Sequence, residues 1–194
     1  MKQYLEMKFK NKHIGLILGL TFIIFSFLFF GRQQGIYQIL LFVGLLISFV
    51  FYLTIMFGKE TIKSKIIWTI VIVLSALFQQ LTEPLLIKSS YLIYLKSNKT
   101  ELTEVTNILI EKRGEIWITK DTIRDENCVL TNLEKEKLKK LRQKLNVYII
   151  DKSEDEIYYG FWGFLDVRLG ITYLTNKNEL HEKNLQHLTD NWFH

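Results

Sequence analysis

Residues 66–87 read IIWTIVIVLSALFQQLTEPLLI and divide the chain into two parts of different character. The stretch begins with an apolar run from Ile66 to Phe78, turns polar at Gln79, and contains the only proline of the chain, Pro84. Before it the sequence is largely apolar, and after it polar and apolar residues are mixed, as in a domain that folds in water. We therefore expect this stretch to join a membrane region to an aqueous domain.

The charge distribution follows the same boundary. Residues 1–87 contain eight lysines and arginines against three acids, whereas residues 88–194 contain seventeen of each, so the net charge of +5 belongs to the membrane part. A protein that binds nucleic acid would carry its positive excess on the aqueous domain. Nucleic acid is therefore not an expected partner, and the lipid bilayer is.

Three uncharged stretches predict transmembrane helices at about residues 14–30, 36–57 and 66–82, because about 20 apolar helical residues cross a bilayer. A signal peptide is the competing interpretation of the first stretch. However, the apolar run is long for a signal peptide, and no small-x-small cleavage pattern follows it. We expect a three-helix transmembrane region over residues 14–87, preceded by a basic leader at residues 1–13.

The basic residues also predict an orientation, because cytoplasmic loops are enriched in lysine and arginine. The leader has four lysines, the first loop has one arginine, and the second loop has three lysines. This pattern predicts a plasma (or inner) membrane protein with a cytoplasmic N-terminus and an extracytoplasmic C-terminal domain. Lys88, Lys96 and Lys99 oppose this orientation, because they place positive charge just after the third span. A cytosolic domain is therefore the alternative.

Two pairs of small residues in the spans are spaced for close helix packing. Gly15 and Gly19 form a G-x-x-x-G pattern, and Gly44 and Ser48 form a small-x-x-x-small pattern. Such residues allow two helix backbones to approach closely. We expect them to pack within the three-helix bundle, and a contact in a homo-oligomer is the alternative.

The aqueous domain, residues 88–194, contains two helix patterns. Apolar residues at helical spacing predict a helix at residues 100–113, with Gly114 as its C′ residue. A T-x-x-E sequence that starts at Thr131 has the form of a capping box and opens a second helix, residues 132–145. The second helix carries one leucine stripe and a lysine-rich opposite face.

Strand patterns alternate with these helices. Strands are expected at residues 115–119 and 147–150, and residues 157–174 predict a strand pair or a bent strand with glycine-induced bulges. The aromatic tail is expected to pack on the sheet. The predicted fold class is three transmembrane helices followed by a small α+β domain with a mostly antiparallel sheet, and residues 96–194 are expected to fold alone.

No stretch of the sequence matches a common catalytic, nucleotide or metal motif. His181, His187 and His194 lie in one polar stretch with Glu182, but their spacing is unlike that of a zinc site. The single cysteine, Cys128, has no second cysteine or histidine near it and is expected to be a small core residue. The sequence therefore predicts no catalytic residue, no metal ligand and no cofactor.

The strongest binding signal is a run of aromatic residues in the predicted strand pair. Neighbouring side chains of a strand point to opposite faces, so these rings cannot all lie in one core. Exposed tyrosine and tryptophan rings are typical of contacts with a partner or ligand, whereas coverage of the second face by a helix or by the tail is the alternative. The expected contact residues are Tyr158, Tyr159, Phe161, Trp162 and Phe164.

These patterns predict an accessory, sensor or immunity-type membrane protein, in which an extracytoplasmic α+β domain binds a protein or a small ligand without catalysis. The alternative is an oligomeric membrane effector of a defence or stress system, in which a cytosolic domain senses a ligand. The side of the membrane on which the C-terminal domain lies separates the two hypotheses.

Overall fold

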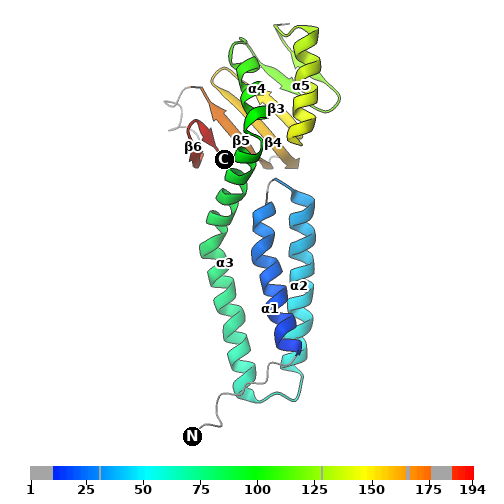
Figure 1. The fold of residues 1–194 in the computed structure, drawn as a ribbon. Helices are drawn as coiled ribbons and strands as arrows, with labels where there is room; N and C mark the ends of the chain where they lie inside the picture. Colours follow the sequence, from blue (N-terminus) through cyan, green and yellow to red (C-terminus); the bar gives the residue numbers. More distant parts are fainter. Residues whose placement is uncertain (1–10, 31, 128, 165–166, 176–184) are drawn as a thin grey trace. The chain divides into compact units, whose positions relative to one another are not determined.

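The computed structural model describes residues 11–30, 32–127, 129–164, 167–175 and 185–194 (Figure 1). The chain forms two compact units. The first consists of Met1–Phe30 with Gln34–Ile87, and the second is built on Lys88–His194. The division between Ile87 and Lys88 falls at the end of the stretch where the sequence changes character.

Three helices of the first unit are long and apolar enough to cross a membrane. Helix α1 (Asn11–Ser26) continues into the short 3-10 helix η1 (Phe27–Phe29) and is followed by α2 (Gln34–Met56) and α3 (Ile62–Ser97). The three predicted spans are therefore confirmed as helices, with ends that differ by a few residues for the first two.

The third helix is much longer than the predicted span and continues through Pro84 to Ser97. Proline removes one helical hydrogen bond and crowds the carbonyl group of the preceding turn, so the predicted span ended near residue 82. For residues 89–95 the sequence predicted either a continuation of the helix or an interfacial turn, and the structure shows the continuation. The last turns of α3 instead bury Tyr91, Tyr94 and Leu95 in the second unit. This tertiary packing stabilises the helix beyond the proline.

Helices α1 and α2 touch through their backbones. A methyl group added at Gly44 would lie 2.9 Å from the carbonyl oxygen of Gly19 and 2.9 Å from the main-chain nitrogen of Ile23. One added at Gly19 would lie 2.7 Å from the main-chain nitrogen of Ser48, and one added at Gly15 would overlap the ring of Phe51. The small residues of both patterns thus lie in a contact within one chain.

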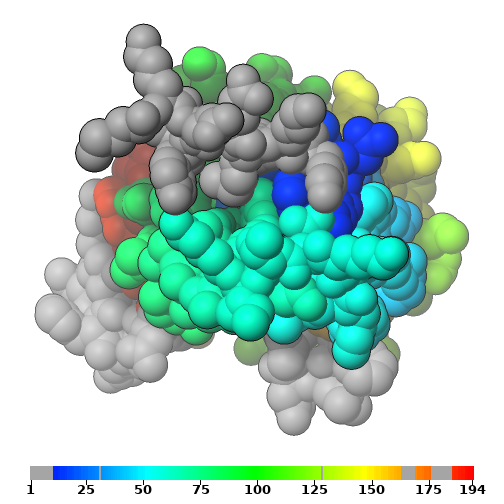
Figure 2. Space-filling model, turned by 90° about the horizontal axis from the view of Figure 1, so that it is seen from below, coloured from blue at the N-terminus to red at the C-terminus, as the bar shows by residue number. Residues whose placement is uncertain are grey.

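A polar and aromatic cluster lies at the end of the bundle where α2 joins α3. Lys12 and Glu60 form an ion pair of 2.5 Å, and the rings of His13 and Trp68 stack at 4.7 Å between centroids. Trp68 also forms a buried apolar cluster with residues of the other two helices, Leu16 and Ile55. Figure 2 shows this end, with the cyan α2–α3 connection beside the blue start of α1.

The second unit contains a seven-stranded sheet in the order β2-β1-β3-β4-β5-β7-β6. Every strand pair of the described residues is antiparallel, which confirms the predicted fold class. The strands are β1 (Ile116–Ile118), β2 (Ile123–Asp125), β3 (Ile149–Lys152), β4 (Glu156–Phe164), β5 (Val167–Leu174), β6 (His187–Thr189) and β7 (Trp192–Phe193).

Helices α4 (Lys99–Ile110) and α5 (Asn132–Leu145) lie on one face of this sheet (Figure 1). Each helix buries the leucine-rich stripe that its sequence predicted, because the opposite stripe is polar. Full burial of one large apolar side chain contributes about 1.5–3 kcal/mol to stability. The core between helices and sheet contains Leu102, Val105, Leu109, Leu138, Leu141, Leu145, Ile116, Ile118, Ile150, Ile157, Tyr159 and Ile171.

Of three local features predicted for the second unit, the capping box and the packing of the tail are present, and the Gly114 helix end is not. The capping box is confirmed, since the main-chain nitrogen of Glu134 donates to Thr131 Oγ1 at 3.3 Å and that of Thr131 donates to Glu134 Oε2 at 2.8 Å. The tail also packs on the sheet as expected, as strand β7. Gly114 is not the C′ residue of α4: the helix ends at Ile110 with Glu111 as C-cap, and Gly114 adopts a φ of 92° in the loop that follows.

Candidate functional site

The predicted aromatic contact residues separate onto different surfaces. Tyr159 is completely buried, and its hydroxyl oxygen lies 2.8 Å from Thr106 Oγ1 on α4. Burial raises the pKa of the Tyr159 hydroxyl, although the hydrogen bond with Thr106 acts in the opposite direction. Tyr159 is therefore a core residue and is not available to a partner.

Phe161 points to the same side of β4 as Tyr159. Its ring centroid lies 4.5 Å from that of Tyr94 and 6.0 Å from that of Tyr91, both on α3. Phe161 is half-buried. Phe161 therefore belongs to the contact between the end of α3 and the sheet.

Tyr158 lies on the other face of β4, where its ring covers two glycines. Gly160 and Gly170 are paired across β4 and β5, and a Cβ atom at Gly170 would lie 2.7 Å from Tyr158 Cε2. Tyr158 and Trp162 are both half-buried, and the predicted bulge separates Gly160 from Trp162. Contact through these two rings stays a prediction, and the side chain of Phe164 lies outside the described residues.

The histidines do not form a metal site in the described part of the chain, where no group of three His, Cys, Asp or Glu side chains could hold a metal ion. His187 Nε2 lies 3.1 Å from the carbonyl oxygen of Asp190. His194 packs against Tyr91, and burial, followed by the charge of Lys88, lowers its pKa. His181, Glu182 and Cys128 lie outside the described residues.

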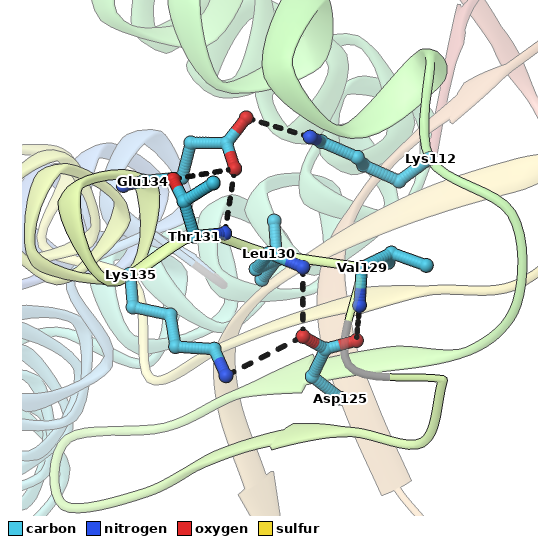
Figure 3. Close-up of polar contacts among 7 residues, drawn as sticks. All are labelled: Lys112, Asp125, Val129, Leu130, Thr131, Glu134 and Lys135. Carbon is cyan, nitrogen blue, oxygen red and sulfur yellow. Dashed lines mark hydrogen bonds and ion pairs between the residues drawn. The ribbon is translucent and has the colours of Figure 1, made fainter.

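A cluster of hydrogen bonds and ion pairs surrounds the Asp125 carboxylate (Figure 3). Asp125 accepts hydrogen bonds from the main-chain nitrogens of Val129 at 3.0 Å and Leu130 at 2.9 Å, and pairs with Lys135 at 3.5 Å. Its side chain is only 2% exposed. Burial raises the pKa of Asp125, but the hydrogen bonds and Lys135 outweigh burial and lower it overall.

Glu134 continues this cluster at the start of α5 (Figure 3). Lys112 Nζ lies 2.7 Å from Glu134 Oε1, and Thr131 donates to Oε2 from both its main-chain nitrogen and its hydroxyl. The hydrogen bond from Lys112, followed by those from Thr131, lowers the pKa of Glu134 to about 2. The cluster fixes the loop between β2 and α5, so its role is structural.

We expect this cluster to make the stability of the protein depend on pH below about 4.5. A carboxylate whose pKa is lowered by folding stabilises the folded state above its unfolded pKa, and this contribution is lost as the pH falls through the folded pKa. Melting of the full chain in detergent should therefore move to lower temperature between about pH 4.5 and pH 2. Glu134→Gln should flatten this dependence.

The control for this pH prediction is Glu136→Gln, which makes the same change on the exposed face of α5. Circular dichroism melts of the three proteins at each pH are the measurement. An identical pH profile for wild type and Glu134→Gln would contradict the prediction.

A groove of about 580 Å³ lies between the end of α3, the start of α4 and the β5–β7–β6 edge of the sheet. Its apolar surface comes from three leucines and two aromatic rings, and its polar surface includes two lysines. These seven residues are Leu92, Leu95, Leu102, Tyr173, Trp192, Lys96 and Lys99. The volume and the mixture of apolar walls with a few polar groups are typical of small-molecule sites.

No protein-family model, curated protein or solved structure matches this chain.

The two lysines of the groove resemble Lys140 and Lys144 on α5, which are also exposed and form no ion pair in the described residues. Lys96 and Lys99 are exposed, and no acidic side chain of the described residues forms an ion pair with them. By contrast, Lys112, Lys135 and Lys137 each pair with an acid at 3.5 Å or less. The groove therefore presents positive charge that the described part of the protein does not neutralise.

A smaller hollow of about 300 Å³ lies on the β1–β2 side of the sheet. The guanidinium of Arg124 sits 5.0 Å from the ring centroid of Trp117, and Trp117 is 38% exposed. Tryptophan and arginine are enriched among residues that dominate protein interfaces. However, Glu115, Glu126 and Asp151 line the same hollow, so its described lining carries more negative than positive charge.

Proposed function

We propose that the chain is a membrane protein whose C-terminal domain binds a ligand or partner outside the cytoplasm, without catalysis. The observation that supports this proposal is the groove, which combines an apolar wall with two lysines that lack ion pairs in the described residues. Such a surface suits recognition of a molecule that has an apolar part and an anionic part.

An accessory, sensor or immunity-type role fits the position of the groove on the chain. One wall of the groove consists of Leu92, Leu95 and Lys96, which belong to the same unbroken helix as the third candidate span. A molecule in the groove would therefore contact the helix that continues into the membrane region. This continuity favours a sensor among the binding roles.

The second candidate is an oligomeric membrane effector with a cytosolic ligand-sensing domain. The observation in its favour is the positive charge of Lys88, Lys96 and Lys99 just after the third span, because positive charge beside a span favours the cytoplasmic side. Its groove would be the same, but its ligand would come from the cytosol.

A fusion at the C-terminus separates the two candidates. We expect a reporter that is active only outside the cytoplasm, such as alkaline phosphatase, to be active when fused after His194. Fusions after Gly35 and Lys63, at the first residues of α2 and α3, provide an outside and an inside control. Activity at His194 from a reporter that works only in the cytoplasm would contradict the proposed orientation and favour the effector.

A further inference from the structure

We infer that the groove binds an anionic lipid of the bilayer, with an apolar chain on the leucine wall and a phosphate or carboxylate head at Lys96 and Lys99. This inference rests on the proposed binding function and specifies its ligand.

The apolar wall of the groove has exposed surface that the acyl chain of a ligand can cover. Leu95 and Leu102 are 7% and 1% exposed, so they form a fixed floor. Leu92 and Trp192 line the groove but are only half-buried, so part of their surface still faces solvent. An acyl chain would cover the exposed apolar surface of Leu92 and Trp192. Each square ångström of apolar surface removed from water contributes roughly 25 cal/mol to the free energy of binding.

The charge of the groove selects an anionic head. Lys96 and Lys99 supply two ammonium groups, and the hydroxyls of Thr103 and Thr189 supply further hydrogen-bond donors. Asp190 is the single acid among the described residues of the lining, so these residues keep a positive excess. Lysine binds phosphate and carboxylate as a mobile point charge, which suits a lipid head that is not held in one orientation.

The order of the groove residues at the end of α3 and the start of α4 suits a lipid that arrives from the membrane. Leu92 and Leu95 precede the lysines at positions 96 and 99, so this part of the apolar wall is nearer in sequence to the membrane region, whereas Leu102 follows the lysines. A bilayer lipid has its chain and its anionic head in the corresponding order. A soluble anion such as free phosphate would use the lysines but leave the leucine wall uncovered.

Native mass spectrometry of the full chain in detergent tests the inference. The probes are phosphatidylglycerol, which is anionic, and phosphatidylcholine with the same chains, which has no net charge. We expect one phosphatidylglycerol molecule to bind at least tenfold more tightly than phosphatidylcholine. Lys96→Glu combined with Lys99→Glu should remove this preference, since the charge at the groove is reversed.

Two further variants locate the site. Thr103→Trp should weaken phosphatidylglycerol binding at least tenfold, because the larger side chain at the lining fills the groove without changing its charge. Lys140→Glu combined with Lys144→Glu makes the same charge change on exposed positions of α5 and should leave the affinity unchanged. A circular dichroism melt of each variant checks its folding, and Lys96→Gln with Lys99→Gln replaces the glutamates if that variant does not fold.

Three results would overturn the inference. These are equal affinity for the two lipids, an equal loss of affinity in the α5 control, and full binding by Thr103→Trp. Inorganic phosphate that competes for the lysines without any effect of Thr103→Trp would identify a soluble anion as the ligand. None of these outcomes decides the proposed orientation, which depends on the reporter fused after His194.

Discussion

A fragment that begins at Lys88 should fold alone and melt cooperatively, whereas a fragment that begins at Lys96 should be largely unfolded. The difference between them includes Tyr91, Tyr94 and Leu95, which are 2%, 5% and 7% exposed. The hydroxyl group of Tyr94 also donates a hydrogen bond to the carbonyl oxygen of Leu145, with 2.8 Å between the two oxygens. Removal of a buried aromatic side chain typically costs about 3–5 kcal/mol, and small domains have only about 5–15 kcal/mol of stability.

Circular dichroism melts and amide NMR spectra of the two fragments measure this difference. The matched substitutions are Tyr94→Ala and Ile93→Ala within the longer fragment, because Ile93 is the adjacent residue of α3 and is 48% exposed. We expect Tyr94→Ala to lose several kcal/mol of stability and Ile93→Ala to lose less than about 1 kcal/mol. Equal melting temperatures for the two fragments would show that the end of α3 is not part of the domain.

This expectation revises the one drawn from the sequence, which began the independent domain at residue 96. Pro84 and the polar residues around it are local signals, and they favour the end of a helix. The packing of Tyr91 and Tyr94 against Phe161 is a long-range effect, and no local pattern encodes it. The spans and the capping box of α5 could be predicted because hydropathy and capping act over a few adjacent residues.

The groove could not be predicted from the sequence, although three of its residues had been noted for other reasons. Lys96 and Lys99 were interpreted only as opposing charges in the topology argument, and Trp192 only as part of a tail that packs on the sheet. They come together because β7 pairs with β5, with Trp192 opposite Tyr173. A two-residue strand such as β7 has too few residues to show a strand period, so its pairing partner is set by the fold.

The faces on which the aromatic side chains of β4 lie could be predicted only in part. The alternation of a strand predicts that Tyr158 and Tyr159 face opposite sides, and the structure confirms this. The sequence could not decide which of the two rings faces the helices, and the bulge after Gly160 resets the alternation for the aromatic residues that follow. Nor could it predict that Gly170, ten residues further along the strand pair, makes room for the ring of Tyr158.

In the membrane region, Gly44→Ala should separate α1 from α2 and destabilise the bundle by about 2–3 kcal/mol. The added methyl group would lie 2.9 Å from main-chain atoms of α1, and a backbone cannot move aside as a side chain can. Overpacking of this kind typically costs about 1–3 kcal/mol, and the loss of close contacts between the helices adds to it. Gly19→Ala should act similarly, since its methyl group would meet the backbone of Ser48.

Gly35→Ala is the matched control, because Gly35 belongs to the same helix, α2, and nothing lies within 4 Å of the added methyl group. Alanine is a better helix former than glycine by roughly 1 kcal/mol, so this variant should be as stable as wild type or more stable. Unfolding of the full chain by increasing sodium dodecyl sulfate, followed by tryptophan fluorescence, gives the stabilities. If Gly44→Ala instead leaves unfolding unchanged and alters only the oligomeric state in gel filtration, the small residues act between copies of the chain, and a contact within one chain is not their role.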